Sequence, residues 1–320
     1  MNNSFGHKFK VSIFGESHTP QVGVTISGIP EDVTVTVEEL MPDLLRRKGG
    51  KLWTTARKEE DIPSLKRDGD NLTITFENRD IRPADYEQFK EVPRPGHADF
   101  TASSRGMLSS GGGIFSGRMT LPLVAAGVVA KKMITPVRIE ASLIKIGGVP
   151  CSESEEVSAL LAKTASEGDS LGGIIECVCT DVPVGIGEPF FDSMESLIAH
   201  AVFSVPGIRG IEFGDGFASA SMKGSRHNDP FIDSSGHTSR NGSGGINGGL
   251  SNGNPIVFRC AVKPTSSIRL TQQTYDFRHN CMTNLTITGR HDVCFALRVP
   301  PVIEAVTAIT LADFVLMQNC

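Results

Sequence analysis

The chain has 320 residues, of which 39% are hydrophobic and 21% are charged. These fractions are close to the average for soluble globular proteins and exclude a disordered, collagen-like or coiled-coil chain. Acidic residues outnumber basic ones by 36 to 31, which gives a formal net charge of -5. No global positive field would therefore attract nucleic acid or an anionic membrane, and we expect neither as a partner. An anionic ligand would need a local basic pocket.

The cysteines and the N-terminal segment indicate a cytoplasmic protein. Seven cysteines are present, and no two have C-x-x-C spacing. Cys177 and Cys179 would point the same way along a strand, but that spacing does not by itself make a metal site. Reduced thiols are the expectation in the cytoplasm. The N-terminus has no apolar signal segment, and no stretch approaches 18 apolar residues, so we expect no membrane anchor.

Hydrophobic periodicity predicts an α+β protein. Short β-branched segments ended by turn residues predict strands over 9–14, 22–27, 71–76, 137–146, 173–181, 208–222 and 255–262. Helical periodicity predicts helices over 37–48, 118–134, 154–167, 192–203 and 301–317. The two kinds of element alternate unevenly, which favours layered α+β architecture over a regular doubly wound sheet. No repeat or linker divides the chain, so we expect one domain over residues 1–320.

Three segments are unlike ordinary connectors, namely residues 14–20, 92–116 and 225–253. The last two are long, polar and rich in glycine. Long loops in a compact domain are usually functional or disordered, and both interpretations stay open for these segments.

Two of the eight histidines, His18 and His97, lie in tight loops rich in Gly or Pro. Such loops can present an imidazole to a ligand, and the ordinary pKa of histidine suits proton transfer near neutrality. A structural or merely exposed histidine is the alternative. Arg94, Arg105 and Arg118 flank His97 along the chain and favour an anion site there.

A second basic group ends the predicted helix over 37–48 and continues into the next loop, as Arg46, Arg47, Lys48, Lys51 and Arg57. Guanidinium groups bind phosphate and carboxylate bidentately, so converging arginines would define a site for a small polyanion. A solvated basic helix end, favoured by the helix dipole, is an equal alternative for this group.

Two further segments combine cations with hydrogen-bonding groups. Lys263-Pro264-Thr265-Ser266-Ser267 follows a predicted strand and suits a phosphate, although a solvated turn has the same composition. Gly289-Arg290-His291-Asp292 follows a strand predicted over 285–288, and a surface turn is its alternative. The sequence contains no Walker A, G-x-S-x-G or H-E-x-x-H motif and no G-x-G-x-x-G between a strand and a helix, which disfavours conventional dinucleotide and zinc enzymes.

Seven motifs, in order, resemble the chorismate synthase family. They are FGESH at 14–18, RPGHADFT at 94–101, GIGEPFFD at 185–192, GIEFGDGF at 210–217, GGINGGLSNGNPIVFR at 244–259, KPTSSI at 263–268 and GRHD at 289–292. The resemblance runs from Phe5 to about Met317. It implies a single-domain β-α-β sandwich, a homotetramer, and a shikimate-pathway enzyme. That enzyme would convert 5-enolpyruvylshikimate-3-phosphate into chorismate and phosphate by a 1,4-anti elimination that requires reduced FMN without net redox change.

The resemblance also implies roles for individual residues. His18 would assist the departing phosphate, His97 would lie beside the flavin pyrimidine, and Asp292 would act with flavin N5 to remove the C6 hydrogen. The residues implied to bind the phosphate and two carboxylates of the substrate are Arg46, Arg57, Arg94, Arg118 and Arg290. Those implied to bind FMN are Phe115, Ser116, Gly248, Lys263, Pro264, Thr265, Ser266, Ser267 and Arg290. Because no dinucleotide fingerprint accompanies them, reduced flavin is expected from an external source rather than from an intrinsic NAD(P)H-dependent reductase.

Departures from the family motifs motivate a second hypothesis. Thr19 stands where Gly usually follows the histidine, and the shorter SLKRDGDNLTITFE replaces a familiar threonine- and glycine-rich segment between Ile62 and Asn78. Leu52 lies where an arginine is common. The alternative to an active enzyme is therefore a divergent, non-catalytic relative that binds FMN or another anion.

Overall fold

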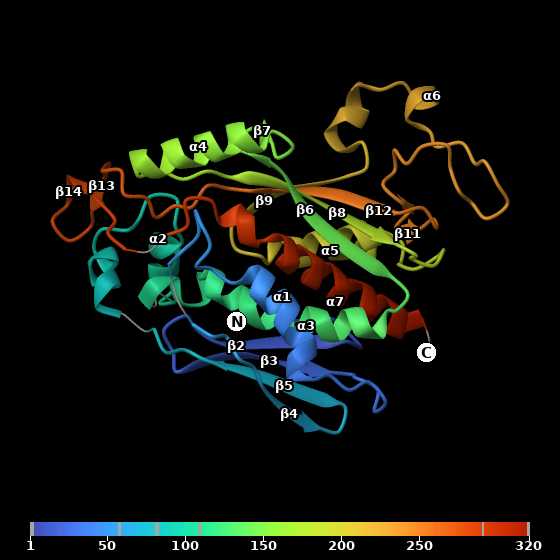
Figure 1. Ribbon diagram of the computed structural model, residues 1–320, viewed down its shortest axis with the longest axis horizontal. Coiled ribbons are helices and arrows are strands. Elements are labelled where there is room, and N and C mark those ends of the chain that lie inside the picture. Colours follow the sequence, from blue (N-terminus) through green and yellow to red (C-terminus); the bar gives the residue numbers. More distant parts are fainter. Residues whose placement is uncertain (1–2, 57–58, 81–82, 108–109, 290, 319–320) are drawn as a thin grey trace.

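The protein is a sandwich of two antiparallel five-stranded sheets with helices between them (Figure 1). The computed structural model describes residues 3–56, 59–80, 83–107, 110–289 and 291–318. The first sheet consists of β1 (Ser4–Phe5), β2 (Lys10–Gly15), β3 (Gln21–Ser27), β5 (Asn71–Glu77) and β4 (Ser64–Asp68), in that spatial order. The second consists of β7 (Val149–Pro150), β6 (Arg138–Ile146), β8 (Gly173–Thr180), β12 (Ile256–Val262) and β9 (Ile208–Phe213).

Each sheet buries one face against the helices. Leu72, Ile74 and Phe76 of β5 are buried, and the residues between them are not, as the two-residue period of a strand requires. In the second sheet, Cys177 and Cys179 of β8 are buried in the same core. Burial raises the pKa of Cys177 well above its ordinary value, so this thiol is a protonated core residue.

The middle layer contains α1 (Val37–Arg47), α3 (Thr120–Met133), α5 (Met194–Phe203) and α7 (Pro300–Gln318). Helices α3 and α7 are apolar on most faces, as expected of helices covered on all sides. They pack so closely that a Cβ on Gly127 would lie 2.3 Å from the Cβ of Ala305. Only glycine fits at this crossing without a backbone shift.

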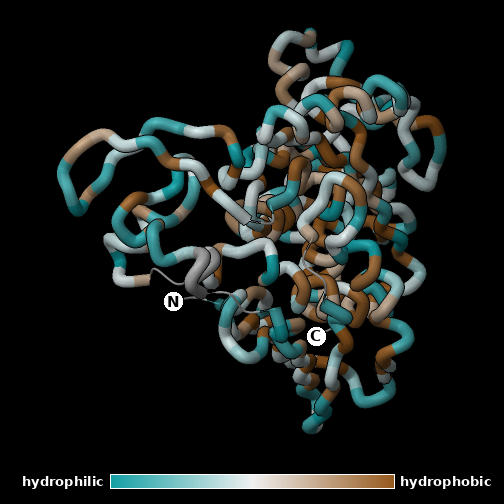
Figure 2. Tube along the Cα trace, turned by 60° about the vertical axis from the view of Figure 1, so that its left-hand side comes forward, coloured by the Kyte–Doolittle hydropathy of each residue, from teal (hydrophilic) through white to brown (hydrophobic). Residues whose placement is uncertain are grey.

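Helix α7 is the one described helix long and apolar enough to cross a membrane, and 78% of that segment is buried inside the protein. This burial is typical of a core helix. Its Asp313 carboxylate is almost fully buried and accepts hydrogen bonds from the backbone N–H groups of residues 7–9, at 2.7–2.9 Å. Figure 2 shows hydrophobic residues concentrated in the middle of the molecule and hydrophilic ones along the projecting loops.

Smaller elements surround the sandwich. Helix α4 (Ser154–Glu167) covers the outer face of the second sheet (Figure 1). The remaining helices and strands are α2 (Asp99–Ser103), α6 (Gly224–His227), β10 (Ile246–Asn247), β11 (Leu250–Ser251), β13 (Gln272–Asp276) and β14 (Cys281–Leu285). The short 3-10 helices are η1 (Pro83–Lys90), η2 (Ser110–Phe115), η3 (Gly117–Met119), η4 (Phe190–Asp192), η5 (Gly216–Ser221) and η6 (Phe295–Arg298).

The α+β class and the β-α-β sandwich are confirmed, but two predicted strands are wrong in extent. The strand predicted over 208–222 ends at Phe213, because Gly214 turns with a φ of 53° against the backbone of Gly242. The strand predicted over 285–288 has only Leu285 in β14, whose ladder with β13 ends at the pair Gln272 and Leu285. Strands β4, β13 and β14 were not predicted. Their side chains are mostly exposed and polar, so they carry little hydrophobic periodicity.

Candidate active site

Loops from both sheets and the helical layer enclose a cavity of about 260 Å³. Its lining includes the predicted site residues His18, Arg94, His97, Phe115, Ser116, Arg118, Thr265, Ser266, Ser267 and Asp292. A second cavity of about 490 Å³ shares His97, Phe115, Thr265, Ser266 and Asp292 with the first and adds Lys263 and Pro264. We call them the first and second cavities. The structure thus brings together residues separated by more than 270 positions in the sequence.

His18 lies on the connection between β2 and β3, with its ring centroid 5.2 Å from that of Tyr86. The hydroxyl of Thr19 closes this turn, because it accepts a hydrogen bond from the Glu16 N–H at 2.8 Å and lies 2.9 Å from the Gln21 carbonyl oxygen. Thr19 is not among the described residues with positive φ, so glycine is not needed there. This departure therefore braces the loop that carries His18.

His97 is held by a buried carboxylate at the start of α2. Its Nδ1 lies 2.6 Å from an oxygen of Asp99, and the Arg94 guanidinium binds Asp99 through Nε and Nη2, both at 2.7 Å. Arg94 also donates to the Ser267 hydroxyl, at 3.1 Å, and its guanidinium carbon lies 4.5 Å from the ring centroid of Phe89. Arg94 thus reaches the cavity wall as predicted, but its charge is already paired.

The charge of Asp99 fixes the tautomer of His97. Burial raises the pKa of Asp99, but the hydrogen bonds from Arg94 and His97 outweigh it and hold that pKa well below its usual range. An ionised carboxylate can only accept hydrogen bonds, so Nδ1 of His97 carries a hydrogen directed at Asp99. Nε2 is then the nitrogen that can exchange a proton with a ligand.

Helix α1 brings Arg47, rather than Arg46, to the first cavity. The helix begins at a capping box between Thr36 and Glu39, and two consecutive side chains at its end point to different sides. Arg46 binds Glu304 of α7 through Nη1 and Nη2, at 2.8 and 2.6 Å, and does not line the cavity. Arg47 is buried and lines it, with bonds to Thr120 and to the Gly117 carbonyl. The predicted role of Arg46 in substrate binding therefore does not fit its position.

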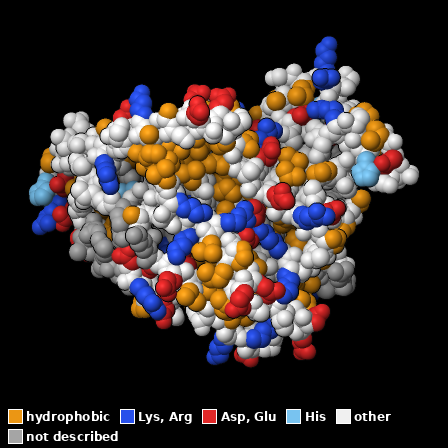
Figure 3. All heavy atoms as spheres, viewed as in Figure 1, with side chains coloured by type: hydrophobic (Ala, Val, Ile, Leu, Met, Phe, Trp, Pro, Cys, Tyr) orange, Lys and Arg blue, Asp and Glu red, His pale blue; other side chains and the backbone are white. Residues whose placement is uncertain are grey.

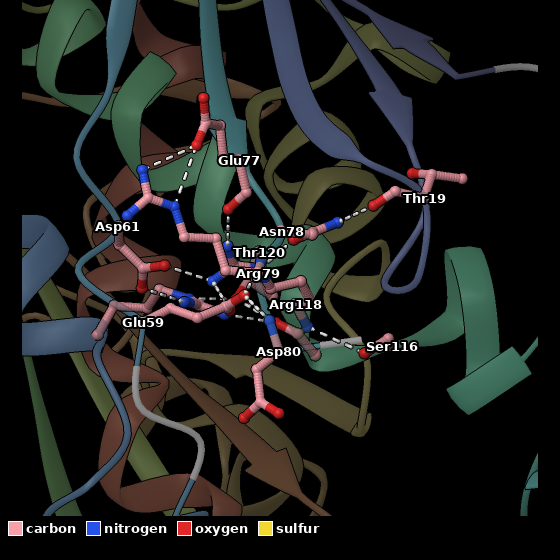
Figure 4. A network of polar contacts seen from close by, with 12 residues as sticks. Thr19, Glu59, Asp61, Glu77, Asn78, Arg79, Asp80, Ser116, Arg118 and Thr120 are labelled. Atoms are coloured by element: carbon pink, nitrogen blue, oxygen red, sulfur yellow. Dashed lines mark hydrogen bonds and ion pairs between the residues drawn. The ribbon is translucent and has the colours of Figure 1, made fainter. Parts of the chain in front are cut away.

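Arg118 lies in a buried polar network at the cavity wall (Figure 4). Its Nη1 forms ion pairs with Asp61 and, at 3.1 Å, with Glu59. Its Nε donates to Asn78 at 3.0 Å. Asn78 in turn donates to the carbonyls of Glu16 and Thr19. The shorter segment between Ile62 and Asn78 therefore builds the β4–β5 hairpin and ends on a residue that completes this wall.

Asp292 is also paired. Its two carboxylate oxygens accept hydrogen bonds from Nε and Nη2 of Arg298, at 3.0 and 2.9 Å, and one accepts from the Thr55 N–H at 2.9 Å. Asp292 lines both cavities, as does Arg298. Arg298 was not predicted. It lies six residues after Asp292 on η6, a spacing with no motif signal of its own.

The KPTSS segment supplies the second cavity with a cation and hydroxyl groups. Lys263 Nζ donates to the Gly96 carbonyl and to the Ser266 hydroxyl, at 2.6 and 2.9 Å. Burial and the nearby charge of Arg209 lower the pKa of Lys263. No described carboxylate pairs with Lys263 or Arg209, and both line the second cavity. The buried hydroxyl of Thr265 has no hydrogen-bond partner among the described residues, so it is available to a polar group of a bound molecule.

The remaining predicted site residues are Gly248, Arg57 and Arg290. Gly248 turns between β10 and β11 with a φ of 62° and lines neither cavity. Arg57 and Arg290 lie outside the described residues. Lys48, by contrast, lines the first cavity without an ion-pair partner among the described residues, and only its place in the basic group after α1 could have indicated it. In the described part of the chain, no cluster of His, Cys, Asp and Glu could hold a metal ion.

Known proteins match this chain over nearly its whole length. Residues 9–316 match the family described as "Chorismate synthase". A chorismate synthase of Chitinophaga pinensis is 53% identical over 328 residues, covering 99% of this chain and 97% of the relative. One from Dehalococcoides mccartyi is 39% identical over 353 residues, covering 99% and 97%.

The fold is similar to that of a solved structure described as "Crystal Structure of Chorismate Synthase". The TM-score is 0.75 at 24% identity, and the match covers 98% of this chain and 93% of the other. At that identity the structure supports the sandwich fold, whereas the sequence relatives and the family match support the assignment itself. Four of the seven motifs, those at 14–18, 94–101, 263–268 and 289–292, contribute residues to the two cavities. The chain belongs to the chorismate synthase family, enzymes of the shikimate pathway.

Proposed function

We propose that the protein eliminates phosphate from 5-enolpyruvylshikimate-3-phosphate to form chorismate, with reduced FMN bound beside the substrate. The single observation that carries this proposal is the convergence of His18, the His97–Asp99 pair and the KPTSS segment on two joined cavities. In the reaction a proton leaves C6, the double bond shifts, and the C3–O bond to phosphate breaks. Electrons and atoms balance without an oxidant.

His18 and His97 handle protons in this proposal. His18 lies at the first cavity and would donate a hydrogen bond or proton to the leaving phosphate oxygen. His97 would use Nε2, because its Nδ1 is committed to Asp99. An imidazole with a fixed tautomer at the cavity wall can stabilise one protonation state of a bound ligand.

The second cavity suits the flavin. FMN has a phosphate, ribityl hydroxyls and ring nitrogens, and this wall offers Lys263, Arg209 and the unpartnered Thr265 hydroxyl. When bound, the reduced flavin would supply electron density to the allylic system of the substrate. Phe115, which is 38% exposed and lines both cavities, would contact its ring.

Asp292 would take up the C6 proton with the flavin, and Arg298 would set its orientation. Both Asp292 oxygens bind Arg298, so this carboxylate keeps one position at the boundary between the two cavities. We expect Arg298→Lys to lower kcat more than it raises KM, because lysine cannot reproduce the two parallel hydrogen bonds.

The reaction is tested by anaerobic phosphate release with photoreduced FMN and no nicotinamide. Release of phosphate together with chorismate would support the proposal and would also show that no intrinsic reductase is needed. Binding of FMN and substrate without release would instead favour the non-catalytic relative. If the pure protein reduced flavin with NAD(P)H, that result would contradict the expectation that reduced flavin comes from an external source.

The identity of the flavin is tested by comparing FMN with riboflavin, which lacks the phosphate. Lys263→Met keeps the aliphatic length and removes the cation, so it should weaken FMN binding and leave riboflavin binding unchanged. The matched control is Lys163→Met, because Lys163 is an exposed lysine of α4 whose only ion-pair partner in the described part of the chain is Glu167. Equal loss for both flavins would show that Lys263 does not contact the phosphate.

We also propose that the chain is a cytoplasmic, single-domain homotetramer. One continuous hydrophobic core joins both sheets and the helices, which supports one domain. Several large hydrophobic side chains are strongly exposed, including Phe190 at 88%, Phe191 at 92% and Phe217 at 83%, and such exposure favours self-association. On the face drawn in Figure 3, basic and acidic side chains are interspersed, which fits a small-molecule enzyme better than a nucleic-acid partner. Light scattering of the wild type and of Phe190→Ser would test the tetramer.

A further inference from the structure

One carboxylate bridges two arginines at the wall of the first cavity. Asp61 contacts Nη1 of Arg118 through one oxygen, and its other oxygen lies 3.6 Å from Nη1 of Arg47. The two arginines come from different elements, α1 and η3. This two-point contact is the one that a carboxylate or phosphate of a bound ligand would make.

The network leaves the arginines little capacity for a ligand. Nε of Arg118 donates to Asn78, and its Nη2 donates to the Glu77 carbonyl (Figure 4). Nε and Nη2 of Arg47 are used by Thr120 and Gly117. Among the described residues, the carboxylates of Glu59 and Asp61 lie opposite the two guanidinium groups and form ion pairs with them. A polyanion would gain little attraction from this wall while both acids remain in place.

The two acids are not equally fixed. Glu59 accepts hydrogen bonds from the backbone N–H groups of Arg79 and Asp80, at 2.8 and 3.1 Å. Among the described residues, the Asp61 carboxylate accepts its hydrogen bond only from Arg118. Asp61 also has a positive φ of 57° and lies on irregular backbone between α1 and β4. A carboxylate on irregular backbone with a single hydrogen-bond donor is the easier of the two to move.

We propose that Asp61 is an internal counter-ion that holds Arg47 and Arg118 in place in the absence of ligand and yields them to an anionic group of the substrate. The inference rests on the proposed function, because it takes the ligand to be the triply anionic substrate. It makes Asp61 a specificity-determining residue that competes with the ligand. Its removal should weaken the fold and strengthen anion binding, whereas loss of a merely structural residue would weaken both.

The test is Asp61→Asn, because asparagine tolerates the positive φ and removes only the charge. Substrate affinity is measured by calorimetry with oxidised FMN, so that no turnover occurs. We expect the variant to have a lower melting temperature than the wild type when no ligand is present. We also expect it to bind the substrate at least about tenfold more tightly. The repulsion between a unit charge and an anion a few ångströms away is larger, at a protein-like dielectric, than the free energy of a tenfold change in affinity. The substrate-induced rise in melting temperature should also exceed that of the wild type.

Asp43→Asn is the matched control. Asp43 is an acidic residue of α1 that pairs with Arg46 and Lys131 away from the cavity. Asp43→Asn therefore changes the net charge by the same amount as Asp61→Asn, and it also removes a carboxylate from basic partners. It should lower stability and leave substrate affinity unchanged. The inference would be overturned if Asp61→Asn bound the substrate no more tightly than Asp43→Asn does.

Two further outcomes are decisive. If Asp61→Asn is unfolded without ligand, recovery of the folded state on adding substrate or inorganic phosphate supports the inference. Failure of both Asp61→Asn and Asp61→Gly to fold at any concentration of either anion overturns it, because a displaceable counter-ion is dispensable once ligand is bound. A wild type that neither binds nor converts the substrate refutes the proposed function instead, and the comparison of variants with inorganic phosphate then tests Asp61 by itself.

Discussion

Replacing Asp99 by asparagine should destabilise the protein and disable His97 together. Asp99 is 2% exposed and neutralises Arg94, which is 5% exposed. Asparagine keeps one acceptor oxygen but leaves the buried guanidinium without a counter-charge. Breaking a buried pair from one side costs about 3–5 kcal/mol of unfolding free energy, which lowers the ratio of folded to unfolded protein by roughly a hundred- to a thousandfold or more. Activity should fall by a larger factor than the ratio of folded to unfolded protein does, because asparagine no longer fixes the Nδ1–H tautomer of His97.

Urea unfolding of both proteins at several pH values measures the effect. The pKa of Asp99 is lower in the folded state than in the unfolded chain, so its contribution to stability is fully present above the unfolded value of about 3.9. That contribution is lost as the pH falls toward the folded pKa, and Asp99→Asn should remove this part of the pH dependence.

A matched control is Asp276→Asn, which removes the carboxylate partner of the exposed His279 at 2.8 Å on the β13–β14 hairpin. Its cost in unfolding free energy should be much smaller than that of Asp99→Asn, because solvent screens an exposed pair. Equal costs for the two variants, or full activity of Asp99→Asn, would refute the assignment of Asp99 as the charge partner of Arg94 and the orienting group of His97.

Three other substitutions test the packing and the site. Gly127→Ala should cost about 1–3 kcal/mol of unfolding free energy because its methyl group meets Ala305 at the α3–α7 crossing, and the added Ala305→Gly should restore part of it in denaturant titrations. Asp313→Ala should cost about 2–4 kcal/mol and increase proteolysis of the N-terminal segment, since it leaves several buried N–H groups unpaired. Arg47→Ala should raise the KM for the substrate far more than Arg46→Ala does. Arg46→Ala should lower only the melting temperature. The opposite order of KM values would show that Arg46 reaches the ligand.

The sequence by itself determined the elements of the core and the family. Strands β3, β5, β6, β8 and β12 and helices α1, α4 and α7 lie within a few residues of their predicted bounds. The strands and helices α1 and α4 bury apolar side chains at the period of their own backbone, and α7 is a long apolar segment that is buried on all sides. The ordered motifs identified the family for a similar local reason. Each is a short loop whose glycine, proline and hydroxyl residues are set by its own turn geometry and ligand chemistry.

Only the tertiary structure decided which charges are available at the site. The pairing of Arg94 with Asp99 is local, but the contacts of Arg118 with Asp61 and of Arg46 with Glu304 join positions far apart in sequence, and no periodicity reports such pairs. A basic residue in a motif predicts a cation, whereas its pairing depends on which acids the packed sheets and helices place opposite it. For this reason the sequence predicts Arg46 and Arg118 alike as site residues. Only the packed molecule shows that Arg46 is turned away from the cavity and that Arg118 is held there by Asp61.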